Sequence, residues 1–347
     1  MRRLLAIGCW FAALSAAGAS APPFFFGGPE VTKLDWATRS LTPADINGDG
    51  REDLAVINND SSRIELLIQR DPEAEAPETK KRVSENRWDP VLEDARFRVD
   101  GLATGFSLFD LAVGDLNGGG RADLAYTARE VPLTIRFQGE SGSWGPVRES
   151  DSFESLGWVD TMRIADLEGD GSNELVVIAA DAIRIYRHDA ADRLKEPETY
   201  FVTGENPFNL MLEDVNQDGL KDILYITASG KQSLAVRQQL AGGGYGPERR
   251  YFFDRPVRAL SALPGGGSGQ LRFCAVDSRS GSLECFELVR ETDPEADGVG
   301  RQPLIYPLFK EGSETPGHAY ADLDGDGRRD LVMAHADGAE LVVFRSG

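Results

Sequence analysis

Cysteine, histidine and positive charge are all scarce in this sequence of 347 residues. It contains three cysteines and three histidines, and its formal net charge is −20. The excess of carboxylates argues against nucleic acid and anionic membrane surfaces as partners. None of His188, His318 and His335 has a metal-ligand spacing with another histidine or a cysteine, and we interpret His318 as a packed strand residue. No nucleophile elbow, phosphate loop or zinc motif is present. We therefore expect no catalytic residues and a protein that is not an enzyme.

Beyond its N-terminus the sequence also lacks any stretch apolar enough to span a bilayer. At the N-terminus, Arg2 and Arg3 precede LLAIGCWFAAL and then small residues, which is the layout of a secretory signal peptide. We expect residues 1–21 to be this signal, cleaved after Ala19 or Ala21. The alternative is a membrane anchor, but the apolar run is shorter than the roughly 20 residues that a spanning helix needs. We therefore expect a secreted, periplasmic or cell-surface protein.

Sustained helical periodicity is absent as well, and an internal repeat dominates the chain instead. Five copies place acidic or amide residues at alternate positions before a glycine-containing turn and an apolar run. A sixth copy keeps the glycines and the apolar run without the acids. The copies begin at 45, 115, 166, 214, 262 and 322, and they read DINGDGREDLAVI, DLNGGGRADLAYT, DLEGDGSNELVVI, DVNQDGLKDILYI, ALPGGGSGQLRFCAV and DLDGDGRRDLVMA.

The surroundings of each copy predict four short β-strands. An apolar segment leads into each loop (LFDLAVG, TMRIA and NLMLE are examples), and three β-rich runs separated by turn residues follow it. The run directly after the loop is apolar on both faces, as expected for a strand between neighbouring sheets. Four strands in a repeat of roughly 48 residues are typical of a β-propeller blade. The sequence therefore predicts an all-β protein, with one β-propeller domain over residues 22–347.

The two ends of the chain predict how the ring closes. Residues 322–347 and 22–44 together have the length of one repeat, and they match different parts of it. We therefore expect six blades, with one blade built from both termini, which removes the exposed sheet edges. A seven-bladed ring is the alternative. Two charged segments near 71–90 and 291–300 lengthen their repeats, and we interpret both as surface insertions.

The spacing of oxygen-bearing side chains in each loop suits calcium, which prefers oxygen ligands. In the first copy, Asp45, Asn47 and Asp49 occupy loop positions 1, 3 and 5, the Arg51 carbonyl would serve at position 7, and Asp53 stands at position 9. An EF-hand requires a glutamate at position 12 and flanking helices. Position 12 here lies inside a β-like run, so the EF-hand is excluded.

The pattern D-x-[DN]-x-D-G-x-x-D before an apolar strand resembles the FG-GAP or VCBS-type repeat of integrin α-subunit propellers and of many exported bacterial proteins. The resemblance covers residues 22–347 and implies structural Ca²⁺ at four to five sites. The copies at 45, 214 and 322 are complete, the copy at 166 uses longer glutamates, and the copy at 115 has Gly119 in place of an acid. The implied metal ligands are Asp45, Asn47, Asp49, Arg51, Asp53, Asp115, Asn117, Arg121, Asp123, Asp166, Glu168, Asp170, Ser172, Glu174, Asp214, Asn216, Asp218, Leu220, Asp222, Asp322, Asp324, Asp326, Arg328 and Asp330.

The acid-free copy contains the two cysteines that follow the signal segment. Folding FCAVDSRSGSLECF as a hairpin about Arg279 and Ser280 places Cys274 directly opposite Cys285. In an oxidising compartment this arrangement predicts a disulfide, which would staple the one blade without an acidic loop. The alternative is two free buried thiols.

These features predict a calcium-stabilised propeller that binds a protein or glycan partner through one end of the ring. We expect a monomer that binds no nucleic acid. Trp88, in the first insertion, is a candidate contact residue, although it could equally be a local loop anchor. The alternative function is a calcium-dependent polysaccharide lyase or another carbohydrate-active enzyme. Such an enzyme would need a basic residue and a Tyr, His or Lys converging at the mouth of the ring.

Overall fold

The structure is a computed structural model. It describes residues 26–35, 37–71, 96–150, 153, 155–189, 193–228, 232–253, 256–263, 272–277, 282–287, 304–307, 317–325, 327, 329–335 and 340–346. The expected signal peptide at 1–21, the insertions from residue 72 to 90 and from 291 to 300, and Trp88 lie outside the described residues. So do Asp326 and Arg328 of the last acidic loop.

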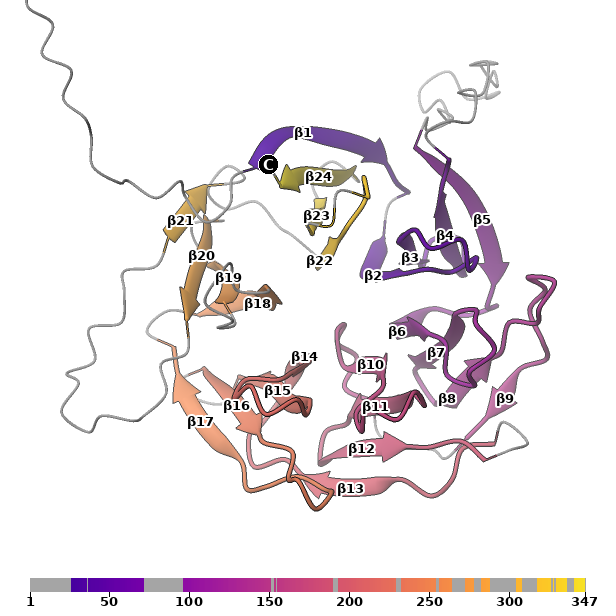
Figure 1. The fold of residues 1–347 in the computed structure, drawn as a ribbon. Helices are drawn as coiled ribbons and strands as arrows, with labels where there is room; N and C mark the ends of the chain where they lie inside the picture. Colours follow the sequence, from indigo (N-terminus) through magenta and orange to yellow (C-terminus); the bar gives the residue numbers. More distant parts are fainter. Residues whose placement is uncertain are drawn as a thin grey trace, which may run out of the picture.

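Six four-stranded antiparallel sheets surround a common axis (Figure 1). The prediction of an all-β propeller with six blades is confirmed, and the seven-bladed alternative is wrong. The first three blades are formed by β2 (Thr38–Ala44), β3 (Asp53–Asn58), β4 (Arg63–Gln69) and β5 (Phe97–Ala103); by β6 (Leu108–Gly114), β7 (Asp123–Ala128), β8 (Val131–Arg136) and β9 (Arg148–Glu149); and by β10 (Met162–Ala165), β11 (Glu174–Ile178), β12 (Ala182–Tyr186) and β13 (Glu198–Phe201).

The last three blades repeat this order from the axis outward. The fourth contains β14 (Phe208–Glu213), β15 (Asp222–Thr227), β16 (Ser233–Arg237) and β17 (Arg249–Phe252), and the fifth contains β18 (Val257–Leu263), β19 (Arg272–Asp277), β20 (Ser282–Glu287) and β21 (Leu304–Pro307). The sixth contains β22 (Gly317–Ala321), β23 (Asp330–His335), β24 (Glu340–Ser346) and β1 (Phe26–Lys33).

The two ends of the chain share this sixth blade. Strand β1 pairs antiparallel with β24, so that Val31 lies opposite Val342 and Lys33 opposite Glu340. The N-terminal segment thus supplies the outermost strand of a sheet whose other three strands come from the C-terminus. The predicted split closure is confirmed, and it ties residues more than 300 positions apart into one sheet.

The second strand of each blade is buried on both faces because a neighbouring blade covers each face. Along β3, Ala55 and Ile57 pack into a core shared with the second blade, whereas Leu54 and Val56 pack into a core shared with the sixth. Every residue of β3, β7, β11 and β15 is buried. One apolar cluster fills each of the six blade interfaces. This packing explains why the runs after the loops are apolar without alternation.

Buried polar residues on or beside the innermost strands link neighbouring blades. Asp110 on β6 accepts hydrogen bonds from Ser40 Oγ at 3.2 Å and from the Thr161 backbone N–H and Oγ1 at 2.6 and 2.8 Å. One carboxylate therefore joins the first three blades. Burial raises the pKa of the Asp110 carboxyl, with the nearby Asp160 carboxylate adding to the effect.

Further hydrogen bonds continue these links around the ring. The Leu210 N–H donates to the Asp160 carbonyl at 2.7 Å between the third and fourth blades. The Asn209 side chain exchanges two hydrogen bonds with the Leu260 backbone, at 2.7 and 2.8 Å, between the fourth and fifth. Ser261 and His318 join the fifth and sixth blades. These residues satisfy buried polar groups at the seams between sheets.

The described residues include no helix with the length and apolarity needed to cross a membrane.

Candidate metal loops and axial cavity

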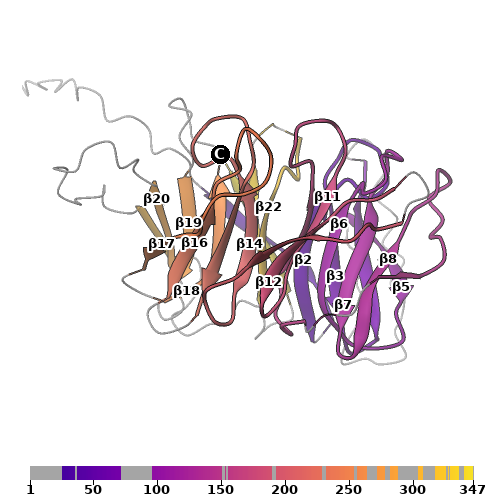
Figure 2. The ribbon, with the colours of Figure 1, turned by 90° about the horizontal axis from the view of Figure 1, so that it is seen from below.

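The five acidic loops each connect the innermost strand of a blade to its second strand. Since the strands run along the ring axis, hairpin loops gather at the two ends of the ring (Figure 2). The same connection in every blade places the acidic loops at one end. The connections from an outermost strand to the next innermost strand emerge at the opposite end.

All five loops hold the carboxylate at position 1 in the same way. One of its oxygens accepts the backbone N–H of the glycine at position 6, at 2.8 or 2.9 Å, in the loops that begin at 45, 115, 166, 214 and 322. These glycines adopt a φ between 76° and 88°, a left-handed conformation that glycine tolerates without steric cost. The turn thus wraps the backbone around the carboxylate of position 1.

Positions 3 and 5 of the complete loops add oxygens to the same turn. In the first loop, Asn47 Oδ1 accepts the N–H of Asp49 at 2.9 Å, and Asp49 Oδ1 accepts the N–H of Arg51 at 2.9 Å. The loop at 214 repeats both contacts with Asn216 and Asp218. Side chains at positions 1, 3 and 5 are thereby fixed along one side of the turn by local hydrogen bonds.

The carboxylates at position 9 close the loops from within the protein. Asp53, Asp123, Asp222, Asp330 and Glu174 are all buried. Each accepts the backbone N–H of position 2 of its own loop, at 2.9 to 3.3 Å. In three blades the second oxygen also accepts a backbone N–H at the end of the third strand, from Gln69, Gln138 or Gln239. The carboxylate at position 9 therefore connects the start of the loop to the sheet by hydrogen bonds.

The loops shift carboxyl pKa values in opposite directions at their two ends. Burial raises the pKa of Asp53 and of Asp123 to about 6, and it also raises the pKa of Glu174 and Asp222. At position 1 of the third loop, the hydrogen bond from the Gly171 N–H instead lowers the pKa of Asp166. A carboxyl whose pKa is raised by burial holds its proton more tightly than a solvated one.

Arginine guanidinium groups already contact some of the loop carboxylates. Arg51 Nη2 lies 2.6 Å from Asp49 Oδ2, and Arg187 Nη2 lies 2.6 Å from Glu168 Oε1. Within the described residues, no three carboxylate, imidazole or thiol groups converge on one point. The residues nevertheless fit calcium by their chemistry, because positions 1, 3 and 5 of each complete loop carry carboxylate or amide oxygens, which are ligands that calcium takes.

The two weaker copies differ from this arrangement in visible ways. In the loop at 115, the Gly119 N–H donates to Asp115 and Asn117, but no carboxylate stands at position 5. In the loop at 166, Arg187 lies close to both glutamates, 2.6 Å from Glu168 and 3.9 Å from Glu174. Ser172 and Leu220 stand at position 7 of their loops, where the resemblance implies that the backbone carbonyl and not the side chain is the ligand.

Each of three loops also contacts the loop of the preceding blade. Arg121 Nη1 donates to the Asn47 carbonyl at 2.6 Å, and Asn173 Nδ2 donates to the Asp115 carbonyl at 2.5 Å. Glu52 Oε2 accepts the N–H of Asp322 at 2.6 Å. These contacts run from position 7 or 8 of one loop to position 1 or 3 of another. Sequence reasoning missed them because it treated each loop alone.

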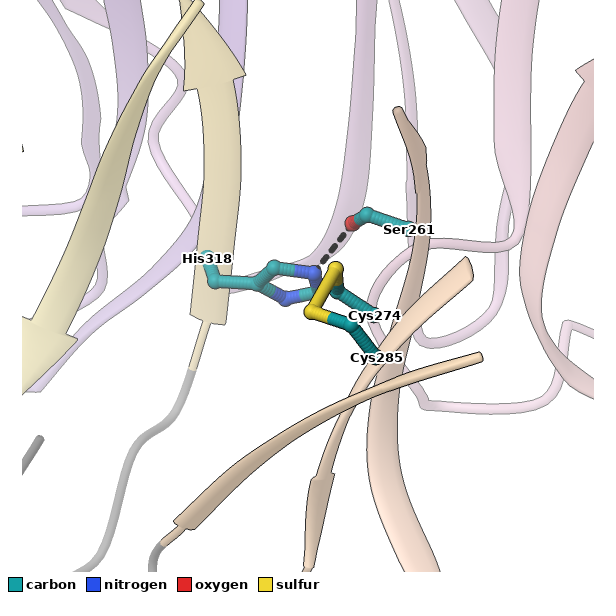
Figure 3. Close-up of a disulfide and its surroundings, with 4 residues drawn as sticks. All are labelled: Ser261, Cys274, Cys285 and His318. Carbon is teal, nitrogen blue, oxygen red and sulfur yellow. Dashed lines mark hydrogen bonds between the residues drawn. A yellow bond between two sulfur atoms is a disulfide. The ribbon is translucent and has the colours of Figure 1, made fainter. Parts of the chain in front are cut away.

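The acid-free fifth blade contains the predicted disulfide. Cys274 on β19 and Cys285 on β20 are paired across the hairpin with Cα atoms 4.1 Å apart, and a disulfide joins them. Figure 3 shows this disulfide beside His318, whose Nε2 is hydrogen bonded to Ser261. The cross-strand pairing inferred from the hairpin is confirmed.

An axial cavity of about 250 Å³ lies inside the ring of innermost strands. All six innermost strands line it, and Arg329 from the last loop contributes at its acidic-loop end. Its charged or titratable lining residues are Asp160, Arg163, Glu213, His318, Tyr320 and Arg329. His318 is a buried strand residue, as its sequence context predicted. Sequence reasoning missed Arg163 and Glu213 as cavity residues. The sequence feature that could have indicated them is a charged residue inside an apolar lead-in segment, Arg163 in TMRIA and Glu213 in NLMLE.

The fold defines the class: the chain is a six-bladed β-propeller, and its acidic loops are similar to the FG-GAP-like repeat. A family model described as an FG-GAP-like repeat matches residues 166–225, which span the third and fourth acidic loops. The resemblance noted in the sequence is thus confirmed.

Among curated proteins, the chain is similar to cartilage acidic protein 1 of Mus musculus, with 24% identity over 349 residues, covering 88% of this chain and 50% of the relative. The human protein of the same name is 24% identical over 347 residues, covering 88% of this chain and 48% of the relative. The chain therefore spans about half the length of the curated relatives it matches.

Solved structures show the same fold at low sequence identity. The crystal structure of BBS1N in complex with ARL6DN, soaked with mercury, has a TM-score of 0.54 at 10% identity and covers 94% of this chain and 97% of its own. An Agrocybe aegerita lectin that recognises non-reducing terminal N-acetylglucosamine has a TM-score of 0.52 at 15% identity, covering 86% of this chain and 75% of its own. At such identities the likeness concerns the fold alone.

Proposed function

We propose that this chain is an exported, calcium-stabilised propeller that binds a protein or glycan partner through one end of its ring. The single observation that supports calcium binding is the geometry shared by the five acidic loops. In each loop, the carboxylate at position 1 accepts the backbone N–H of the glycine at position 6. Calcium would be held by the oxygens of positions 1, 3 and 5, by the carbonyl at position 7 and by the carboxylate at position 9. Bound calcium would relieve the repulsion among these carboxylates and stabilise the folded state.

Export is supported by the N-terminal signal-like segment and by the disulfide, since disulfides persist in oxidising compartments. The interaction role is supported by the fold class. One solved relative in this fold is a complex with a protein and another recognises a sugar. We therefore propose a protein and a glycan as the two candidate classes of partner for this chain.

We assign the partner-binding role to the end of the ring opposite the acidic loops. Trp158 is 53% exposed there, in the connection that leads into β10. Phe106 is exposed in the equivalent connection before β6. Exposed aromatic residues, tryptophan above all, are enriched at protein interfaces and offer flat apolar faces for contact.

A screen against protein ligands, glycans and polysaccharides in calcium tests this role. Trp158→Ala is expected to weaken binding at least about tenfold, the effect of a typical hot-spot residue. Phe201→Ala is the matched control, because Phe201 is 73% exposed but lies on the outer strand β13. Equal affinity for wild type and Trp158→Ala would refute the assignment of this end.

The second candidate is the carbohydrate-active enzyme, and one observation favours it. The axial cavity contains Arg163, His318 and Tyr320, which are residue types that a lyase would use. However, His318 and Tyr320 are each more than nine-tenths buried, and burial raises the pKa of the Tyr320 hydroxyl, which keeps it protonated and unavailable as a base near neutral pH. The cavity is also enclosed by six strands, so a polymer could reach it only end-on. Product detection in the same screen separates binding from cleavage.

A further inference from the structure

The third acidic loop, residues 166–174, differs from the other four loops at two of its oxygen-bearing positions. It has Glu168 at position 3 and Glu174 at position 9. The other four loops have asparagine or aspartate at position 3 and aspartate at position 9. A glutamate side chain is one methylene longer than either of these, so its carboxylate extends farther from the loop backbone. Both glutamates can therefore reach groups that do not belong to the loop.

Both glutamate carboxylates face the guanidinium of Arg187, the residue that follows β12. Nη2 of Arg187 donates to Glu168 Oε1 at 2.6 Å, and its Nε lies 3.9 Å from Glu174 Oε1. Nη1 donates at 3.3 Å to Glu198 Oε2 on β13, the strand beside β12 (Figure 1). Arginine is always charged in proteins. One fixed positive charge thus stands among three carboxylates, two of which belong to the loop.

The residues that correspond to Arg187 in the two adjoining blades are uncharged. The Arg187 carbonyl accepts the backbone N–H of Lys195, eight residues further along the chain, at 2.8 Å. The carbonyls of Phe137 in the second blade and Gln238 in the fourth accept the same contact, also from eight residues further along and at 2.8 Å. These two residues are therefore the counterparts of Arg187. The arginine and the two glutamates occur together in the third blade.

The carboxylate at position 9 also has different partners in this blade. In the first, second and fourth blades, its second oxygen accepts the backbone N–H of a glutamine at the end of the third strand. In the third blade, Glu174 Oε2 accepts the N–H of Leu167 at 3.0 Å, and the second oxygen is the one 3.9 Å from Arg187. The arginine thus stands where the other blades provide a backbone donor.

Contacts with the fourth blade hold Glu198, and with it the arginine, in place. Glu198 Oε1 accepts the hydroxyl of Tyr200, and that hydroxyl oxygen accepts the N–H of Tyr245 at 3.0 Å. The two tyrosine rings contact edge to face with centroids 5.5 Å apart. The Tyr245 hydroxyl donates to the carbonyl of Lys221, position 8 of the fourth acidic loop, at 3.2 Å. Arg187 is therefore positioned by a network that runs from the third loop to the fourth.

The arginine of the first acidic loop has a simpler arrangement. Arg51 is position 7 of that loop, and its Nη2 donates to Asp49 Oδ2 at 2.6 Å. Among the described residues, Arg51 forms an ion pair with this one carboxylate. An ion in the first loop would have to displace a single contact, whereas an ion in the third loop would have to displace a guanidinium held by several carboxylates.

We propose that the guanidinium of Arg187 is the built-in cation of the third acidic loop and takes the place of calcium there. Its positive charge offsets the repulsion among the loop carboxylates, which is the effect proposed for calcium in the complete loops. Calcium in this loop would need the oxygens of Glu168 and Glu174, and it would repel the guanidinium that already faces them. The inference rests on the proposed calcium role of the other loops, and it makes the third blade independent of calcium.

The number of calcium ions bound per chain tests the proposal. Equilibrium dialysis of the full chain measures this number at free calcium concentrations up to about 5 mM, above the Kd of weak extracellular sites. Asp166→Ala and Asp170→Ala, at positions 1 and 5 of the third loop, should bind as many ions as wild type. Asp214→Ala, at position 1 of the fourth loop, is the matched control and should bind one ion fewer. Loss of an ion in either third-loop variant would overturn the proposal.

Removal of the guanidinium gives the second test. Arg187→Gln should bind one calcium ion more than wild type, and calcium should raise its melting temperature by more than that of wild type. In excess chelator it should melt at least about 2 °C below wild type, because three carboxylates lose their cation. Arg193→Gln is the matched control and should match wild type in all three measurements, because the Arg193 side chain is 75% exposed and pairs with Asp189 alone.

The outcomes separate this inference from the proposed function. A wild-type ion count, calcium response or chelator melting temperature in Arg187→Gln would overturn the assignment of Arg187. An unchanged ion count in Asp214→Ala would instead contradict the proposed function. The chelator melts of Arg187→Gln and Arg193→Gln involve no calcium, so they would still decide whether Arg187 is the cation that stabilises the third loop.

Discussion

The Glu52 carboxylate accepts the backbone N–H of Asp322 at 2.6 Å, across 270 residues of sequence. Glu52 is position 8 of the first acidic loop, and Asp322 is position 1 of the last. The contact therefore joins the first blade to the sixth at a residue that we propose binds calcium. Together with the pairing of β1 and β24, it closes the ring at its acidic-loop end.

Loss of this contact should loosen the closure of the ring. Glu52→Ala is expected to destabilise the protein by about 1.5–3 kcal/mol, as for a hydrogen bond to a charged group. Glu140→Ala is the matched control, because Glu140 is exposed in a turn between β8 and β9. Chemical denaturation of both variants measures the difference. Equal stability of the two variants would show that the contact contributes nothing.

Asp110 is expected to be the most sensitive polar residue of the innermost strands. Asp110→Ala leaves the Thr161 N–H and hydroxyl and the Ser40 hydroxyl without their acceptor. We expect a loss of about 2–4 kcal/mol, since several buried donors become unpaired. Ser40→Ala removes only one of these bonds and should cost about 1 kcal/mol. Denaturant melts rank the two, and a smaller effect for Asp110→Ala than for Ser40→Ala would contradict this account.

Blade count, split closure and cysteine pairing could all be predicted from the sequence. They follow from repeat spacing, from the match of the two ends to one repeat, and from hairpin register, which are local or periodic properties. The contacts of Arg121 with Asn47 and of Ser261 with His318 could not be predicted. They depend on how adjacent sheets are rotated about the axis, which no single repeat specifies. The sequence feature that could have indicated such contacts between blades is a charged residue inside an apolar lead-in segment, such as Asp110 in LFDLAVG.

The disulfide should stabilise the fifth blade independently of calcium. Cys274 and Cys285 are 11 residues apart, and closing a loop of this length is worth about 2–3 kcal/mol on the chain-entropy account. A double Cys→Ala variant is expected to lose stability by this amount and to keep the full response to calcium. Melting with and without calcium measures both. A lost calcium response in the variant would mean that the fifth blade is coupled to the acidic loops.

The buried carboxylates at position 9 predict a pH dependence with opposite signs in the presence and absence of calcium. The pKa of an unperturbed aspartate is about 4, whereas burial raises the pKa of Asp123 to about 6. The folded state then holds the proton more tightly than the unfolded chain. In chelator, this contribution to stability is complete below about pH 4 and is lost as the pH rises through about 6.

Comparison with Asp123→Asn isolates this effect, because the variant cannot titrate at that position. In excess chelator, wild type should lose stability relative to the variant as the pH rises from 4 to 7. In calcium, the relative stability of wild type should instead rise with pH, since an ion near the loop favours the charged carboxylate. Denaturant melts at each pH measure the difference, and a difference that does not change with pH would refute the prediction.

The central claim is that calcium in the acidic loops fastens the ring, and thermal unfolding in calcium and in excess chelator tests it most directly. Saturating calcium is expected to raise the melting temperature of wild type by at least about 5 °C. The shift should nearly vanish in the triple variant Asp45→Ala, Asp214→Ala, Asp322→Ala, which lacks position 1 of the three complete loops. Identical melting curves of wild type in calcium and in excess chelator would contradict the account.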